Sequence, residues 1–146
     1  MTQQDVVKEL NQQVANWTVA YTKLHNFHWY VKGPNFFSLH TKFEELYDEA
    51  SQYVDDLAER ILAIGGNPIG TLTESLDKSI VKEAGKNYAA EQMVEELSHD
   101  FTNISKQLEH AIEVAGNAGD DVSEDMFIGM QTSVDKHNWM FKSYLV

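Results

Sequence analysis

The chain has 146 residues, 42% of them hydrophobic, and its 23 acidic residues against 11 lysines and arginines give a formal net charge of −12. This length suits a single domain, 1–146, with a buried core, and the composition excludes a disordered chain. No apolar run approaches the roughly 18 residues that a membrane-spanning helix needs. The chain contains no cysteine, which excludes disulfides, cysteine nucleophiles and thiolate metal sites. Any metal site must therefore use nitrogen and oxygen ligands.

The negative charge also bears on partners and location. A strongly acidic surface concentrates cations and repels the phosphates of nucleic acids. Residues 1–9 contain only Lys8, and the final SYLV has no basic residue, so DNA binding is disfavoured. The first twenty residues lack a basic start followed by an apolar stretch. We therefore expect no secretory signal, no membrane association and a cytoplasmic protein.

Apolar residues recur at steps of three and four in four segments, which is the pattern of amphipathic helices. These segments run over 7–28, 43–64, 94–112 and 127–145. Turn signals rich in glycine follow the first two segments and include a proline in each case. The connection 69–87 is predicted as a loop, with a short helix around 74–82. Four long helices with one long crossover predict an all-α, ferritin-like four-helix bundle.

The second segment carries two pairs of candidate metal ligands. His40 and Glu44 are four residues apart, as are Asp55 and Glu59, so each pair points one way from a helix. The two pairs share one broad face, but His40 and Asp55 lie about 22 Å apart along the axis. Metal–ligand bonds are only about 2 Å long, so one chain cannot close both pairs around one ion. An antiparallel copy, related by a two-fold axis near residues 49–50, sets 40 opposite 59 and 44 opposite 55. The spacing therefore predicts two identical metal sites between two subunits.

His28 is a fifth candidate ligand. The turn after the first segment brings the end of that helix beside the start of the next, so His28 can approach His40. A lone histidine in an apolar stripe is more commonly a packed core residue, and single acids are commonly solvated. Five such residues in this arrangement argue for a shared site.

An intrachain metal site is the main structural alternative. Ferritin-like iron proteins often use two Glu-x-x-His motifs inside one bundle. Only one is present, Glu96 to His99, and both residues fall opposite the apolar stripe, where we expect them to face water. We reject the intrachain site. His25 and His110 are interpreted as surface or packing residues, and His137 as structural.

Acidic residues also cluster before the last segment, at Asp120, Asp121, Glu124 and Asp125. One interpretation is helix capping and complementation of the helix dipole, particularly by Asp121. The other is a pore that attracts cations where several subunits meet. The sequence leaves both open.

Two stretches of the chain resemble the Dps family of ferritin-like miniferritins, particularly its Gram-positive members. They are LHNFHWYVKGPNFFSLHTKFEELYDEASQYVDDLAERILAIGGNP at 24–68 and DDVSEDMFIGMQTSVDKHNWMFKSYL at 120–145. The resemblance implies a dodecamer with tetrahedral 23 symmetry around a cavity, with ferroxidase centres at its two-fold interfaces. It implies an acidic three-fold pore near Asp120, Asp121 and Asp125. Family members that bind DNA usually do so through a lysine-rich terminal extension, which this sequence does not show.

By the same resemblance, one subunit supplies His28, His40 and Glu44 to the ferroxidase centre, and its two-fold partner supplies Asp55 and Glu59. Many relatives have aspartate where this chain has Glu44, so the coordination mode of that longer side chain stays open.

The function we expect is oxidation of Fe(II), preferably by hydrogen peroxide, with storage of Fe(III) as mineral and protection against oxidative damage. Histidine suits Fe(II) and carboxylate suits Fe(III), although zinc can bind the same ligands. The alternatives are a nucleoid protein that compacts DNA and a purely structural helical assembly.

Overall fold

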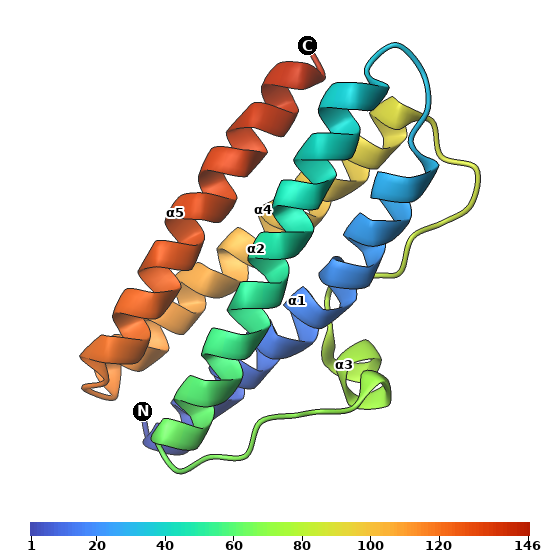
Figure 1. The fold of residues 1–146 in the computed structure, drawn as a ribbon. Coiled ribbons are helices and arrows are strands. Elements are labelled where there is room, and N and C mark those ends of the chain that lie inside the picture. The colour runs from blue at the N-terminus through green and yellow to red at the C-terminus, as the bar shows by residue number, and fades with distance from the viewer.

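The computed structural model describes all residues, 1–146, and contains five helices and no strand (Figure 1). They are α1 (Gln3–Tyr30), α2 (Phe36–Ala63), α3 (Leu72–Lys78), α4 (Ala90–Asn117) and α5 (Asp121–Tyr144). The four long helices lie side by side in a bundle, and α3 sits in the crossover outside it. The predicted all-α, ferritin-like architecture is confirmed.

The apolar stripes of the four long helices meet in one core of 29 buried residues. Trp17 of α1 lies near its centre, with its ring centroid 4.9 Å from that of Tyr53 on α2 and 5.7 Å from that of Phe101 on α4. Burying a large apolar side chain of this kind stabilises a fold by about 1.5–3 kcal/mol. None of the helices combines the length and the apolar character needed to cross a membrane.

The helices extend beyond the stripes that predicted them. The first begins at Gln3, where Thr2 and Asp5 form a reciprocal capping box, and the second begins at Phe36. The short helix expected at 74–82 lies instead at 72–78. Thr71 starts it by accepting a hydrogen bond from the Glu74 amide, an N-cap that the apolar pattern did not mark.

The crossover runs the length of the bundle because α2 ends far from the point where α4 begins (Figure 1). Polar side chains on the outer face of α1 hold it in place. The Asn11 carboxamide oxygen accepts from the Ile69 amide at 3.0 Å, and that of Asn16 accepts from the Ile80 amide at 3.1 Å. The Gln12 side chain donates to the Lys78 carbonyl at 2.8 Å. The crossover is thereby fixed along α1, while α1 and α2 pack directly on each other, as at Trp17 and Tyr53, and position the candidate site.

Candidate metal centre

His28 and His40 form a reciprocal pair where α1 ends and α2 begins. Their rings stack with centroids 3.7 Å apart and planes 13° apart. Nδ1 of His28 lies 2.7 Å from the carbonyl oxygen of His40, and Nδ1 of His40 lies 2.7 Å from the carbonyl oxygen of His28. Because a carbonyl oxygen only accepts, each Nδ1 must carry the proton. In the neutral rings both Nε2 atoms then keep a free lone pair, which is the form of imidazole that binds a metal.

The turn between the helices makes this pairing possible. Gly33 adopts a φ of +107°, which L-residues with a side chain rarely reach. The chain thereby reverses within a few residues, and position 28 comes to face position 40.

Glu44 adds a carboxylate to the pair from the next turn of α2. Its Oε1 lies 3.8 Å from Nε2 of His28, and its side chain is 54% exposed, against 8% for His28. Two atoms that each bond one ion at about 2 Å lie at most about 4 Å apart, so this distance allows a shared ion. The His28 side of this group is therefore buried in the protein, whereas the Glu44 side is open to solvent.

Aromatic rings surround the histidine pair. Phe36 stacks on His40 with centroids 4.9 Å apart, and Tyr47 meets the edge of His28 at 5.2 Å. The ring of His25 stacks on that of Tyr47, with centroids 3.8 Å apart, in agreement with a packing role for His25. Burial and the nearby negative charge of Glu44 raise the pKa of Tyr47, so its hydroxyl stays protonated.

A second group of acids lies further along α2. Asp55, Asp56 and Glu59 are exposed, and one carboxylate oxygen from each lies within 4.8 Å of the others. Spacing of four residues identified Asp55 and Glu59 but not Asp56, whose Oδ1 also accepts from Gln52 at 2.8 Å. The position of Asp56 directly beside Asp55 in the sequence could have identified it as a member of this group.

The structure therefore brings the five predicted residues together as two separate groups. His28, His40 and Glu44 meet near the start of α2, whereas Asp55 and Glu59 meet near its other end. From residue 44 to residue 55 the axial distance is about 16 Å at 1.5 Å per residue. One chain holds each half of the proposed ligand set, at two different places.

Glu96 and His99, the Glu-x-x-His motif on α4, do not form a metal-binding group. His99 is exposed, as expected. Glu96 does not simply face water: it is half-buried and pairs with Nζ of Lys23 at 3.1 Å. Lys23 also pairs with the buried Asp100 at 2.7 Å, so both carboxylates are neutralised by the lysine.

His137 has the structural role expected of it, in a partly buried polar network between α2 and α5. Its Nε2 lies 2.8 Å from Oε2 of Glu49, and its Nδ1 lies 3.0 Å from Nζ of Lys42. Ser133 and Tyr53 also donate to Glu49. Burial by itself raises the pKa of Glu49, but the hydrogen bonds from His137, Ser133 and Tyr53 outweigh it and lower the pKa to about 2. Burial and the hydrogen bond to Glu49 raise the pKa of Tyr53.

Among the acids before α5, the structure assigns capping to Asp120 and not to Asp121. Asp120 is 8% exposed, and it accepts from the Ser123 amide and hydroxyl and, at 2.7 Å, from Nη2 of Arg60. Burial raises its pKa, and these hydrogen bonds more than reverse the effect and lower it. Asp121 and Asp125 are exposed. Of the three acids proposed for a pore, only these two present their carboxylates to solvent.

Residues 7–146 match the ferritin-like domain family. The chain is 52% identical to General stress protein 20U of Bacillus subtilis, over 97% of this chain and 98% of the relative. It is 49% identical to DNA protection during starvation protein 2 of Bacillus anthracis, over 96% of each. The crystal structure of Dps from Staphylococcus aureus gives a TM-score of 0.99 at 89% identity, over 99% of this chain and 97% of that one. A structure of Dps from Listeria innocua soaked with 10 mM zinc for 120 minutes gives 0.93 at 43% identity, over 97% and 96%.

The fold is a ferritin-like bundle, with one polar group where α1 meets α2 and a second further along α2. The chain belongs to the Dps family of ferritin-like proteins, the miniferritins, whose general role is iron storage. The resemblance of residues 24–68 and 120–145 to this family is confirmed over nearly the whole chain.

Proposed function

We propose that this protein oxidises Fe(II), preferably with hydrogen peroxide, at di-iron sites between two-fold related subunits and stores the Fe(III) as mineral. One observation carries the proposal. His28 and His40 fix each other's rings with both Nε2 atoms free beside Glu44, while the carboxylates of Asp55 and Glu59 gather far along the same helix. Each group is half of a ligand set, and an antiparallel second copy of α2 joins the two halves.

The ligand chemistry supports oxidation of iron as substrate. Neutral imidazole nitrogens suit Fe(II), and hard carboxylate oxygens favour Fe(III), so a mixed set favours the change of oxidation state in place. Two Fe(II) ions each lose one electron, the O–O bond of peroxide breaks, and two protons are taken up to give two waters. Delivery of both electrons to one peroxide leaves no hydroxyl radical.

We place this reaction in a homo-oligomer, a dodecamer in keeping with the family, in the cytoplasm. Asp121 and Asp125 are proposed to line a pore that attracts cations, because both are exposed on a chain of formal charge −12. Zinc is expected to compete for the same nitrogen and oxygen ligands.

DNA protection is the second candidate, because the Bacillus anthracis relative carries that name. The net charge of −12 argues against direct contact with DNA phosphates. We expect a gel-shift assay at low salt to leave DNA unshifted. A shift that disappears as salt rises would favour the nucleoid role.

The decisive experiment tests whether two subunits share each site. His28→Ala/His40→Ala subunits and Asp55→Ala/Glu59→Ala subunits carry different affinity tags and are co-expressed, so that mixed assemblies are purified through both tags. Each variant alone should oxidise anaerobically loaded Fe(II) no faster than buffer after a peroxide pulse. A mixed two-fold pair contains one intact site and one doubly damaged site, so mixed assemblies should recover up to about half of the wild-type rate.

Glu109→Gln supplies the control, since it removes an exposed acid of α4 and should leave the rate unchanged. Mixed assemblies that stay inactive while keeping the wild-type mass would overturn the intersubunit site. Wild-type protein no faster than buffer would overturn the ferroxidase and leave a structural assembly.

A further inference from the structure

A cavity of ≈ 700 Å³ opens at the end of the bundle where α1 finishes and α4 begins, a position that can be followed in Figure 1. Its eleven lining residues come from the last turns of α1, the α1–α2 turn, the end of the crossover and the first turn of α4. The volume lies within the roughly 300–1,000 Å³ of small-molecule sites.

Six side chains that line this cavity offer hydrogen-bond donors and make no hydrogen bond within the protein. They are the amides of Asn26 and Asn87, the hydroxyls of Tyr30 and Tyr88, and the ammonium groups of Lys32 and Lys86. Neither ammonium lies within 4.0 Å of a carboxylate. Donors that line one cavity without partners in the protein fit a ligand rich in acceptor oxygens.

The cavity is also free of acidic residues, although the chain has 23 acids against 11 basic residues. The buried basic groups elsewhere are already neutralised: Lys23 pairs with Asp100, and Arg60 pairs with Asp120, each at 2.7 Å. Lys32 and Lys86 are exposed, pair with no carboxylate and line the same cavity without an acid beside them, so the cavity carries positive charge on an acidic protein.

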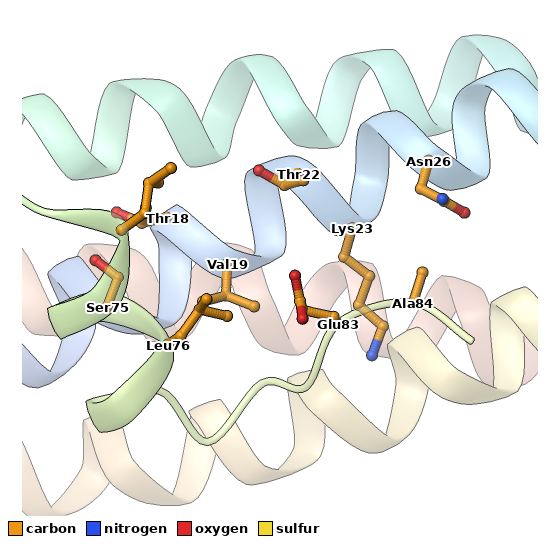
Figure 2. Close-up of a pocket in the computed structure, with 10 residues that line it drawn as sticks. Thr18, Val19, Thr22, Lys23, Asn26, Ser75, Leu76, Glu83 and Ala84 are labelled. Carbon is orange, nitrogen blue, oxygen red and sulfur yellow. The ribbon is translucent and has the colours of Figure 1, made fainter. Parts of the chain in front are cut away.

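A smaller cavity nearby differs from the larger one in its charge, because its lysine is paired with carboxylates. It measures ≈ 210 Å³ and lies between α1 and the crossover, where Lys23, Glu83 and Ser75 line it (Figure 2). Its lysine is bound by the carboxylates of Asp100 and Glu96, and its lining includes an acid. It has no free positive charge to offer an anion.

The larger cavity is open to solvent, and one part of its wall, at Tyr88, is packed against the bundle. The Tyr88 ring packs on Phe27, with centroids 6.0 Å apart, and lies directly over Gly85. A Cβ at residue 85 would come within 2.6 Å of the Tyr88 hydroxyl oxygen, so only glycine admits this ring position. Asn26 and Tyr30 are one turn apart and share a face of α1. His28 lies midway between them, so it points from the opposite side, toward α2, and the cavity is separate from the candidate metal centre.

We propose that this cavity binds a small phosphate-bearing ligand, of the size of a mononucleotide. Lys32 and Lys86 would meet the phosphate as point charges, Asn26 and the tyrosine hydroxyls would donate to its oxygens, and the exposed ring of Tyr30 would stack on a planar group. The proposal does not depend on iron chemistry.

Binding is tested by calorimetry on the assembled protein at low salt, after removal of metal with a chelator so that phosphate cannot bind through iron. The probes are ADP, inorganic pyrophosphate and adenosine. We expect saturable binding of ADP or pyrophosphate and no measurable binding of adenosine. Lys32→Ala/Lys86→Ala should weaken binding by about tenfold or more, because it removes two charge-assisted contacts.

Lys106→Ala/Lys136→Ala is the matched control, since it removes two exposed lysines from α4 and α5 and should leave the affinity unchanged. Tyr30→Leu separates the two sources of phosphate. If the variant binds ADP more weakly and pyrophosphate as tightly as wild type does, the ligand is a nucleotide. If the variant binds both probes as tightly as wild type does, the ligand is free phosphate or pyrophosphate. Equal losses in the two lysine pairs, binding of adenosine as tight as ADP, or no binding would overturn the proposal. Displacement of ADP by duplex DNA that binds more tightly would overturn it in favour of a nucleic-acid contact.

Discussion

His28 and His40 orient each other through the main chain, with each Nδ1 2.7 Å from the other residue's carbonyl oxygen. Because the acceptors are main-chain atoms, removal of one imidazole leaves the hydrogen bond of the other in place. The pair therefore combines two nitrogens that we propose as metal ligands, and the ring of each is supported independently.

The first prediction concerns metal affinity at this pair. His28→Ala and His40→Ala should each weaken Co(II) binding by about tenfold or more, because each loses a nitrogen ligand while the other ring stays oriented. Titration followed by Co(II) absorbance measures it. His25→Ala is the matched control, since His25 stacks on Tyr47 nearby but is not a proposed ligand. Equal affinities in all three variants would contradict the assignment.

The second prediction concerns acid stability and Glu49. Its pKa falls from 4.5 to about 2 in the folded protein, so its stabilising contribution is complete above about pH 4.5 and is lost as the pH falls toward 2. The shift corresponds to about 3 kcal/mol at neutral pH. Glu49→Gln should therefore lower the free energy of unfolding at pH 7 and flatten its decline in acid.

Denaturant unfolding at equal protein concentration, near pH 7 and near pH 3, measures this difference. Glu109→Gln, at an exposed position, should follow the wild-type profile. An unchanged acid slope in Glu49→Gln would show that another carboxylate controls the decline.

The third prediction separates Asp120 from its neighbour. Asp120→Ala should cost about 3 kcal/mol of stability, because it removes the cap of α5 and leaves the Arg60 guanidinium without its carboxylate. Asp121→Ala should change stability by less than about 0.5 kcal/mol, as expected of an exposed side chain. The two midpoints of thermal unfolding give the comparison, and equal midpoints would refute the capping role.

The fourth prediction concerns cation uptake at the proposed pore. Asp121→Asn/Asp125→Asn should slow iron loading at low salt without changing thermal stability, because the negative potential weakens while the packing stays intact. The difference should shrink as salt screens the charges. Stopped-flow absorbance after Fe(II) addition records the rates. Identical rates at low salt would remove these two acids from the uptake path.

Much of the fold was available from the sequence. Steps of three and four between apolar residues predicted the four long helices, because a helix buries one stripe. The predicted stripe began too late, at Phe43, because the helix begins at Phe36, directly after the turn at Gly33 and without a side-chain cap. The short helix was displaced because Thr71 starts it.

The pairing of His40 with Glu44 and of Asp55 with Glu59 on α2 was also predictable, because a spacing of four residues on a helix places side chains together whatever surrounds them. Three facts required the tertiary structure. The mutual hydrogen bonds of His28 and His40 depend on how one turn folds, and the burial of Asp120 depends on Arg60, which lies 60 residues away in sequence. The cavity with Lys32 and Lys86 joins two loops that are distant along the chain. Local periodicity determines which face a side chain occupies, whereas only packing determines what meets it there.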